Sequence, residues 1–209
     1  LNGAYMSRST GLAFDVADLE QIEILRGPQG TLYGRNTTGG AIKLSPRKPD
    51  TDKLALEQTL SSGNNDLFSS NTTLNMPLTK QYAAKLAYFY EDVDGFINND
   101  GPGGGFGDRE SKGLRLDLRA EFTEGLTADY SYDRSEIEYY NYTGQAVLPR
   151  ESEGDGGLLN IVGDIAEQYV DYDRNRINSL ATSVALLPTD TTIDGHTLNL
   201  EWAISESMT

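Results

Sequence analysis

Two glycine-rich stretches are the first places in this chain where a phosphate or a dinucleotide could bind. Gly34 and Gly39 have the four-residue gap of a phosphate-binding loop, but Gly40-Ala41 follows where that loop requires lysine and then serine or threonine. The stretch Gly101–Gly107 never reaches the dinucleotide-binding spacing and follows no buried parallel strand. We therefore expect neither ligand and predict that the second stretch is a flexible loop.

Metal binding and enzyme catalysis have little support in the sequence. The segment that starts at Asp171 begins like a calcium loop, but Arg176 replaces its glycine and Thr182 its bidentate glutamate. His196 is the single histidine and cysteine is absent, so neither a histidine-paired nucleophile nor a histidine or cysteine metal cluster can be built. We predict no catalytic residue, no metal site and no cofactor.

The run RGPQGTLYGRNTTGGAI, residues 26–42, concentrates glycine around two arginines and a tyrosine. Proline presets its own φ and glycine tolerates positive φ, so the run predicts two turns. Between them we expect one helical turn at 31–33, with Gly34 as its C-terminal stop. Strands are expected at 22–25 and 41–44, and a further helical turn at 18–21. The residues singled out in this small α+β module are Arg26, Gly27, Pro28, Gly30, Tyr33, Gly34, Arg35, Asn36, Gly39 and Gly40.

Beyond Pro46 and Pro49, apolar and polar residues alternate with a period of two. In the clearest tract, 114–122, leucine, alanine and phenylalanine alternate with Arg115, Asp117, Arg119 and Glu121. This period indicates strands and not helices. Six strands are expected after a boundary near residue 50, at 53–60, 67–76, 84–91, 114–122, 126–133 and 198–205.

The composition allows these strands to face lipid, although the average residue is polar. The net charge is −15, hydrophobic residues make up 37%, and no apolar run reaches the length of a transmembrane helix. A transmembrane strand needs only about 9–11 residues and turns half of them toward a polar lumen. Eight of the twelve tyrosines lie between Tyr82 and Tyr142, as an interfacial aromatic girdle requires, but tyrosine also favours strands in general.

The connections between the expected strands differ in length at the two ends. Those at 76–81 and 123–125 are short, those at about 93–112 and 141–193 are long, and the short one at 62–66 breaks the pattern. Short turns at one end and long loops at the other are typical of an outer-membrane barrel.

Charge is unevenly distributed along the chain. Residues 1–49 hold four acidic and six basic side chains, a net charge of +2, so the remainder carries −17. Two interpretations stay open: the two parts attract each other, or the acidic surface only keeps the chain soluble. No basic stripe is present, so nucleic-acid binding is not expected.

Three pieces of sequence, Ile22–Pro28, Leu32–Gly34 and Gly39–Ile42, lie in register within residues 18–49. This segment closely resembles the end of the plug domain of TonB-dependent outer-membrane receptors and its join to the barrel. The resemblance implies an all-β membrane protein, with a small α+β plug portion before a plugged antiparallel transmembrane β-barrel of about 22 strands.

The resemblance also implies a division of the chain. We expect residues 1–49 to be the C-terminal part of the plug domain and residues 50–209 to be the N-terminal portion of the barrel. The strands of such a barrel alone need roughly 220 residues, so we expect the chain to be a fragment that lacks the N-terminal energy-coupling box.

The implied function is active import of a scarce solute, most often a ferric siderophore, across the outer membrane of a Gram-negative bacterium. The implied partners are a TonB-type energy-coupling protein, outer-membrane lipid and lipopolysaccharide, and the ferric siderophore. Such receptors pair plug arginines with barrel glutamates, so Arg26 and Arg35 are expected to hold the plug unless they only cap turns or face water. Glycines 27, 34, 39 and 40 are expected to serve tight turns and close packing.

Two other classes of protein also fit alternating strands. One is a soluble all-β binding or adhesion module, and the other is a carbohydrate-active β enzyme that would use Glu151 and Glu153. The direction of the apolar faces separates them from a barrel. A soluble sheet seals these faces inside, whereas a barrel turns them outward to hydrocarbon while residues 1–49 fill its pore.

Overall fold

The structure, a computed structural model, describes residues 18–34, 37–143 and 178–203. These residues form two compact units, of which the second consists of the described parts of Val93–Arg109 and Tyr139–Thr189 and the first of the rest. None of the described residues belongs to a helix that could span a membrane.

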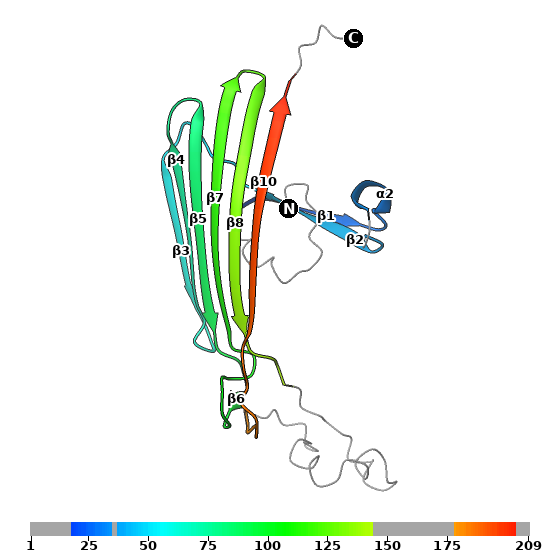
Figure 1. Cartoon of the computed structure of the whole chain (residues 1–209), viewed down its shortest axis with the longest axis vertical. Helices are drawn as coiled ribbons and strands as arrows, with labels where there is room; N and C mark the ends of the chain where they lie inside the picture. Colours follow the sequence, from blue (N-terminus) through cyan, green and yellow to red (C-terminus); the bar gives the residue numbers. More distant parts are fainter. Residues whose placement is uncertain (1–17, 35–36, 144–177, 204–209) are drawn as a thin grey trace. The chain divides into compact units, whose positions relative to one another are not determined.

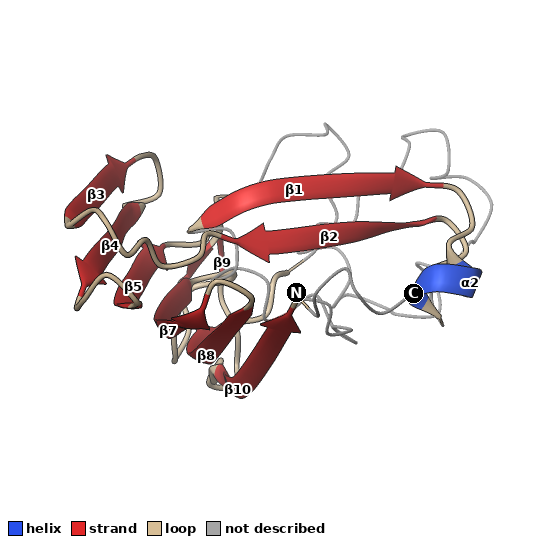
Figure 2. Ribbon diagram, turned by 90° about the horizontal axis from the view of Figure 1, so that it is seen from above, coloured by secondary structure: helices blue, strands red, loops and turns tan. Residues whose placement is uncertain are grey.

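The first element is a hairpin of β1 (Leu19–Arg26) and β2 (Gly40–Pro46), with the short helix α2 (Gly30–Tyr33) at its tip (Figure 2). Gly34 ends α2 with a φ of 75°, as the sequence predicted. The helical turn expected at 18–21 is wrong, because β1 begins at Leu19 and pairs there with β2 across an irregularity in register. The backbone of β2 offers these residues ladder hydrogen bonds that an isolated helical turn cannot match.

Gly40 is the glycine of the hairpin that the backbone requires most. Its φ is 149°, and a Cβ at this position would lie 2.4 Å from the carbonyl oxygen of Leu25. We expect Gly40→Ala to lower the free energy of unfolding of the protein by roughly 1–3 kcal/mol, measured by urea unfolding. Gly39→Ala is the matched control, since a Cβ at Gly39 meets nothing within 4 Å. Equal effects of the two substitutions would contradict this account.

The second element of this unit is a six-stranded sheet, which we call the strand wall. Its strands stand side by side in the order β10-β8-β7-β5-β4-β3 and alternate in direction (Figure 1). All six expected strands are present: β3 (Ala55–Ser62), β4 (Phe68–Pro77), β5 (Tyr82–Val93), β7 (Arg109–Thr123), β8 (Leu126–Tyr139) and β10 (Thr189–Trp202).

The two faces of the strand wall are inverted relative to those of a soluble sheet. On β7 the charged residues Arg115 and Asp117 are buried, whereas Leu114, Leu118 and Phe122 are 38%, 40% and 50% exposed. The apolar face is exposed on other strands as well, at Leu56, Leu60, Leu86, Tyr88, Leu198, Leu200 and Trp202. A sheet that exposes leucine and buries arginine suits hydrocarbon on one side and a polar lumen on the other.

Aromatic residues mark the end of the wall that carries the short turns. Tyr82 is the first residue of β5, Phe122 lies one residue before the end of β7, and Trp202 is the last residue of β10. The rings of Tyr82 and Phe122 meet edge to face, 6.4 Å apart. These positions fit the interfacial girdle of a transmembrane barrel.

The strands reach further toward the long connections than the alternating pattern predicted. The expected loop 93–112 shrinks to the residues between Val93 and Arg109, because β7 begins at Arg109. Here charged pairs replace leucine on the outer face, Lys112 with Glu110 at 2.6 Å and Arg134 with Glu136 at 2.7 Å. The ladder therefore continues beyond the apolar band.

The two long connections meet in the second unit. There β6 (Asn98–Asn99) pairs in parallel with β9 (Ser179–Leu180). The Asn99 amide donates to the carbonyls of Pro102 and Gly104, at 3.1 and 3.0 Å, within the first connection. The backbone amides of Asn98 and Asp100 donate to the carbonyls of Asn178 and Leu180, at 2.9 and 3.0 Å, and so tie the two connections together.

Within the first of these connections, the glycine-rich stretch follows a hydrogen-bonded course around a small core. Ile97 and Phe106 are buried against each other, and the Asp108 carboxylate accepts the amides of Gly95 and Gly105 at 2.9 and 2.7 Å. The stretch is a loop, as the sequence predicted, with a defined path in this unit.

Candidate functional site

A segment of seven residues, Arg47–Lys53, joins the hairpin to the strand wall, and we call it the strap. It lies against the polar face of the wall. The Lys85 ammonium donates to the carbonyl of Arg47, and the Asn75 amide binds the backbone of both Asp50 and Lys53. The polar face is thus the face that the hairpin and the strap approach, which makes it the inner face.

A cluster of buried charges lies where the base of the hairpin meets the wall. Lys85 on β5 is 1% exposed and pairs with Asp18 at 2.5 Å and with Asp117 on β7 at 3.5 Å. Asp117 also binds Arg115 at 3.0 Å and accepts a hydrogen bond from Ser131 at 2.7 Å. We call these five residues the junction cluster. Its two cations and two carboxylates balance, as burial of charge requires.

Small neighbours make room for the buried lysine. Ala83 and Ala87 flank Lys85 on the inner face of β5, and both are 1% exposed. Their methyl groups leave space in which the strap can approach the wall closely. A lysine between two alanines on the polar face of a strand is the sequence signal for this site, and Lys85 was not among the residues singled out from the sequence.

Two further ion pairs extend the contact around the strap. Lys48 meets Asp129 on β8 at 3.0 Å, and Asp129 also faces Arg119 at 3.5 Å. Arg47 meets Glu57 on β3 at 3.1 Å. Arg47 and Lys48 of the basic segment thus pair with acidic residues of the wall, whereas the buried pair of Asp18 and Lys85 has the opposite sense. Both interpretations of the uneven charge stay predictions.

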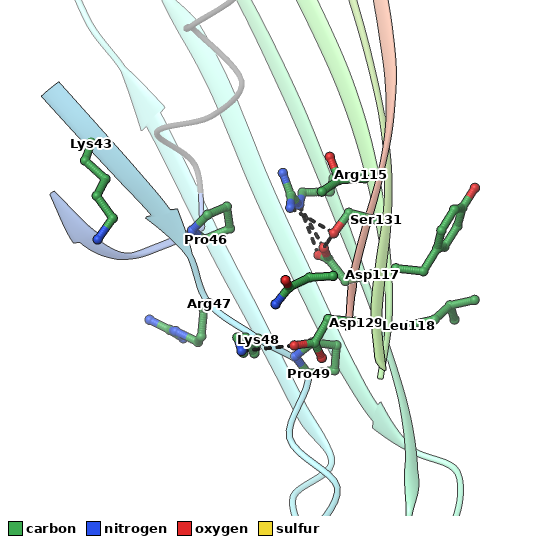
Figure 3. Close-up of a pocket in the computed structure, with 13 residues that line it drawn as sticks. Lys43, Pro46, Arg47, Lys48, Pro49, Arg115, Asp117, Leu118, Asp129 and Ser131 are labelled. Atoms are coloured by element: carbon green, nitrogen blue, oxygen red, sulfur yellow. Dashed lines mark hydrogen bonds and ion pairs between the residues drawn. The ribbon is translucent and has the colours of Figure 1, made fainter. Parts of the chain in front are cut away.

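A cavity of about 380 Å³ opens between the end of the hairpin and the inner face of the wall. Figure 3 shows Arg115, Ser131 and Asp117 on the hairpin side of the strands and Leu118 on the other side. Lys43 and Lys48 line the cavity from the hairpin and the strap. Most of the residues that line it are charged or can form hydrogen bonds, so it is a polar space within the contact.

Of the two arginines that the sequence singled out, Arg26 lies away from the junction cluster. Arg26 is exposed, stands opposite Gly40 at the tip end of the hairpin, and is absent from the ion pairs seen among the described residues. Arg35 and Asn36 lie outside the described residues. The pairing of Arg26 and Arg35 with barrel glutamates therefore stays a prediction.

The remaining singled-out residues shape the hairpin. Gly27 and Gly34 have positive φ, while Pro28, Gly30 and Tyr33 form the turn and the helix at the tip. Along the strands, Lys43 binds Glu23 at 2.7 Å, and this hydrogen bond and charge raise the pKa of Lys43 above its ordinary value. Lys43 therefore keeps its charge to a higher pH than an unpaired lysine.

The chemistry of the junction is attachment and not catalysis. The charged groups of the junction cluster form ion pairs with one another. The described residues contain no group of three or more metal-ligating side chains. A wall with an apolar outer face and a polar inner face, anchored to a hairpin on the inner side, defines the class of plugged transmembrane β-barrels.

Comparisons with known proteins place the chain within this class. The TonB-dependent Receptor Plug Domain family matches residues 1–41. The metal-pseudopaline receptor CntO of Pseudomonas aeruginosa is 31% identical over 179 residues, which are 76% of this chain and 22% of that protein. The chain belongs to the TonB-dependent outer-membrane receptors, a family of transporters and not of enzymes in the Gram-negative outer membrane. The expected family, all-β membrane fold and location are confirmed.

Two other similarities agree. The ferrioxamine B receptor of Salmonella typhimurium is 38% identical over 80 residues, which are 37% of this chain and 11% of that protein. The ferric-catecholate import receptor Fiu of E. coli K12, in its open form, matches 91% of this chain and 27% of its own, with a TM-score of 0.68 and 16% identity. The chain thus spans less than a third of the length of each of these three proteins.

Proposed function

We propose that the receptor that contains this chain imports a scarce metal chelate across the outer membrane, and that this chelate is a ferric siderophore. The observation that carries the proposal is the inverted strand wall with a hairpin anchored on its polar face. Such a wall needs lipid outside and a filled lumen inside. It is a poor basis for a soluble binding module, whose sheet would bury leucine and expose arginine.

The cargo is proposed from the relatives. Two of the three similar proteins carry a metal in the name of their ligand, as metal-pseudopaline and as ferric catecholate. The third is a receptor for ferrioxamine B. A metal chelate is therefore the cargo class that these names share best. The rival carbohydrate-active enzyme rests on Glu151 and Glu153, which lie outside the described residues.

The partners of the receptor and the roles of the two parts of this chain belong to the same proposal. A TonB-type protein supplies the energy, lipid and lipopolysaccharide surround the apolar outer face, and the plug blocks the lumen. Residues 1–49 are proposed as plug and residues 50–209 as barrel. Arg26 and Arg35 are proposed to meet barrel glutamates, and the glycines of the hairpin to hold its turns.

An uptake experiment in cells tests this function. We expect a strain without the receptor to lose uptake of radiolabelled iron for one purified chelate out of a panel, and the cloned receptor to restore it. Loss of the energy-coupling protein should abolish that uptake to the same extent, because import through a plugged lumen needs energy. Uptake that persists without the coupling protein would overturn the mechanism. If cells take up cobalamin or a glycan through the receptor but take up none of the metal chelates, the proposed class of cargo is wrong.

A further inference from the structure

We propose that the strap is a fixed part of the barrel wall, so that the movable part of the plug ends at Pro46. The boundary predicted from sequence lies near residue 50, inside the strap. A polar segment with prolines would ordinarily connect two domains flexibly. The contacts of this segment show a different arrangement, and they do not depend on which cargo the receptor imports.

Asn75 on β4 holds the strap as a neighbouring strand would. Its side-chain oxygen accepts the amide of Asp50 at 2.9 Å, and its nitrogen donates to the carbonyls of Asp50 and Lys53 at 2.9 and 2.6 Å. The amide thus uses its acceptor and both donors on the strap backbone. Asn75 is buried, so releasing the strap would leave these polar groups without protein partners in the lumen wall.

Three further strands hold the strap from other directions. Lys85 on β5 donates to the carbonyl of Arg47, Asp129 on β8 pairs with Lys48, and Glu57 on β3 pairs with Arg47. With Asn75 on β4, side chains from four strands of the wall hold seven residues of chain. The strap can leave the wall only if all four strands release it together.

Among the described residues, the hairpin has no comparable attachment to the wall beyond its base. The ion pairs that join it to the rest of the described chain involve Asp18, directly before β1. Toward the tip, Ile24, Leu32 and Ile42 are more than 60% exposed. The hairpin is therefore held at its base, by Asp18 on one leg and the strap on the other. A force applied to the plug would rearrange residues before Arg47 and stop at the strap.

The order of unfolding tests this inference. The chain has no cysteine, so single cysteines can report on chosen sites. Thr37→Cys reports on the hairpin, Thr73→Cys on the cavity of about 130 Å³ beneath the strap, and Ser111→Cys on the wall; all three sites are buried. The full-length receptor is labelled with a maleimide in detergent at rising urea concentrations.

We expect Thr73→Cys to become reactive at the same urea concentration as Ser111→Cys and at a higher one than Thr37→Cys. Reactivity of Thr73→Cys together with Thr37→Cys would overturn the inference, because the strap would then leave with the hairpin. One shared midpoint for all three sites would overturn it for the same reason. The experiment uses neither cargo nor coupling protein, so its failure is separate from a failure of the proposed import.

A second variant keeps the result specific to the strap. Asn75→Ala should lower the midpoint of Thr73→Cys toward that of Thr37→Cys, because the strap loses its three hydrogen bonds. Asn64→Ala, in the exposed turn between β3 and β4, should leave the midpoint unchanged. If the midpoint of Thr73→Cys does not change in Asn75→Ala, these hydrogen bonds do not hold the strap.

Discussion

Replacing Lys85 by methionine is expected to lower the free energy of unfolding of the receptor by about 3–5 kcal/mol. The substitution leaves the buried carboxylates of Asp18 and Asp117 without the cation that they share. Methionine keeps most of the length of the side chain, so little of the loss is due to a cavity. Urea unfolding in detergent, followed by intrinsic fluorescence, measures the change.

Two comparisons identify the cause of that loss. Lys43→Met removes an exposed lysine from its pair with Glu23 and should be hard to distinguish from the unmodified receptor. Lys85→Met combined with Asp18→Asn leaves the pair of Arg115 and Asp117 intact, so the double variant should recover part of the stability. A loss for Lys85→Met no larger than that for Lys43→Met would mean that the junction cluster does not anchor the plug.

The second large effect is expected on the outer face of the wall. Leu198→Arg should cost up to about 2–4 kcal/mol, depending on depth in the bilayer, because it places a cation in hydrocarbon. Leu198 lies four residues before Trp202, within the apolar band. Asn199→Arg on the adjacent inner position should cost far less, since its side chain faces the lumen. The yield of receptor refolded into lipid vesicles measures both changes.

Exposure alone gives no reason for such a difference. Leu198 and Asn199 are both exposed in the described chain, so a soluble sheet would accept arginine at either position with similar ease. Equal refolding yields for the two variants would therefore contradict a lipid-facing wall. A greater loss for Asn199→Arg would contradict the assignment of inner and outer faces.

The strands could be predicted from the sequence wherever one face meets lipid and the other a polar lumen. That condition produced the alternation on β7 from Leu114 to Phe122. It fails toward the long connections, where Glu110 and Arg134 lie on the outer face and both faces meet polar surroundings. Backbone pairing continues there without an alternating pattern in the side chains. The predicted strands therefore stop short of the long connections.

The site could be predicted only in part. The glycines and the helix of the hairpin follow from local backbone chemistry, and a single sequence shows them. The partners of Lys85 follow from the path of the strap and from the register of β5 and β7, which join residues far apart in sequence. The sequence shows that the two parts of the chain carry opposite net charge. It does not show which of these charged residues pair with each other.

The joined connections of the second unit limit how receptors of this kind can be recombined. The two-residue strands β6 and β9 come from different connections and exist only as a pair. Leu186 in the second connection also exchanges backbone hydrogen bonds with Pro102 and Gly104 in the first. A chimaera that receives one connection from a relative would lose both interactions at once. The two connections therefore have to be transplanted as a set, and they are expected to change in concert between relatives.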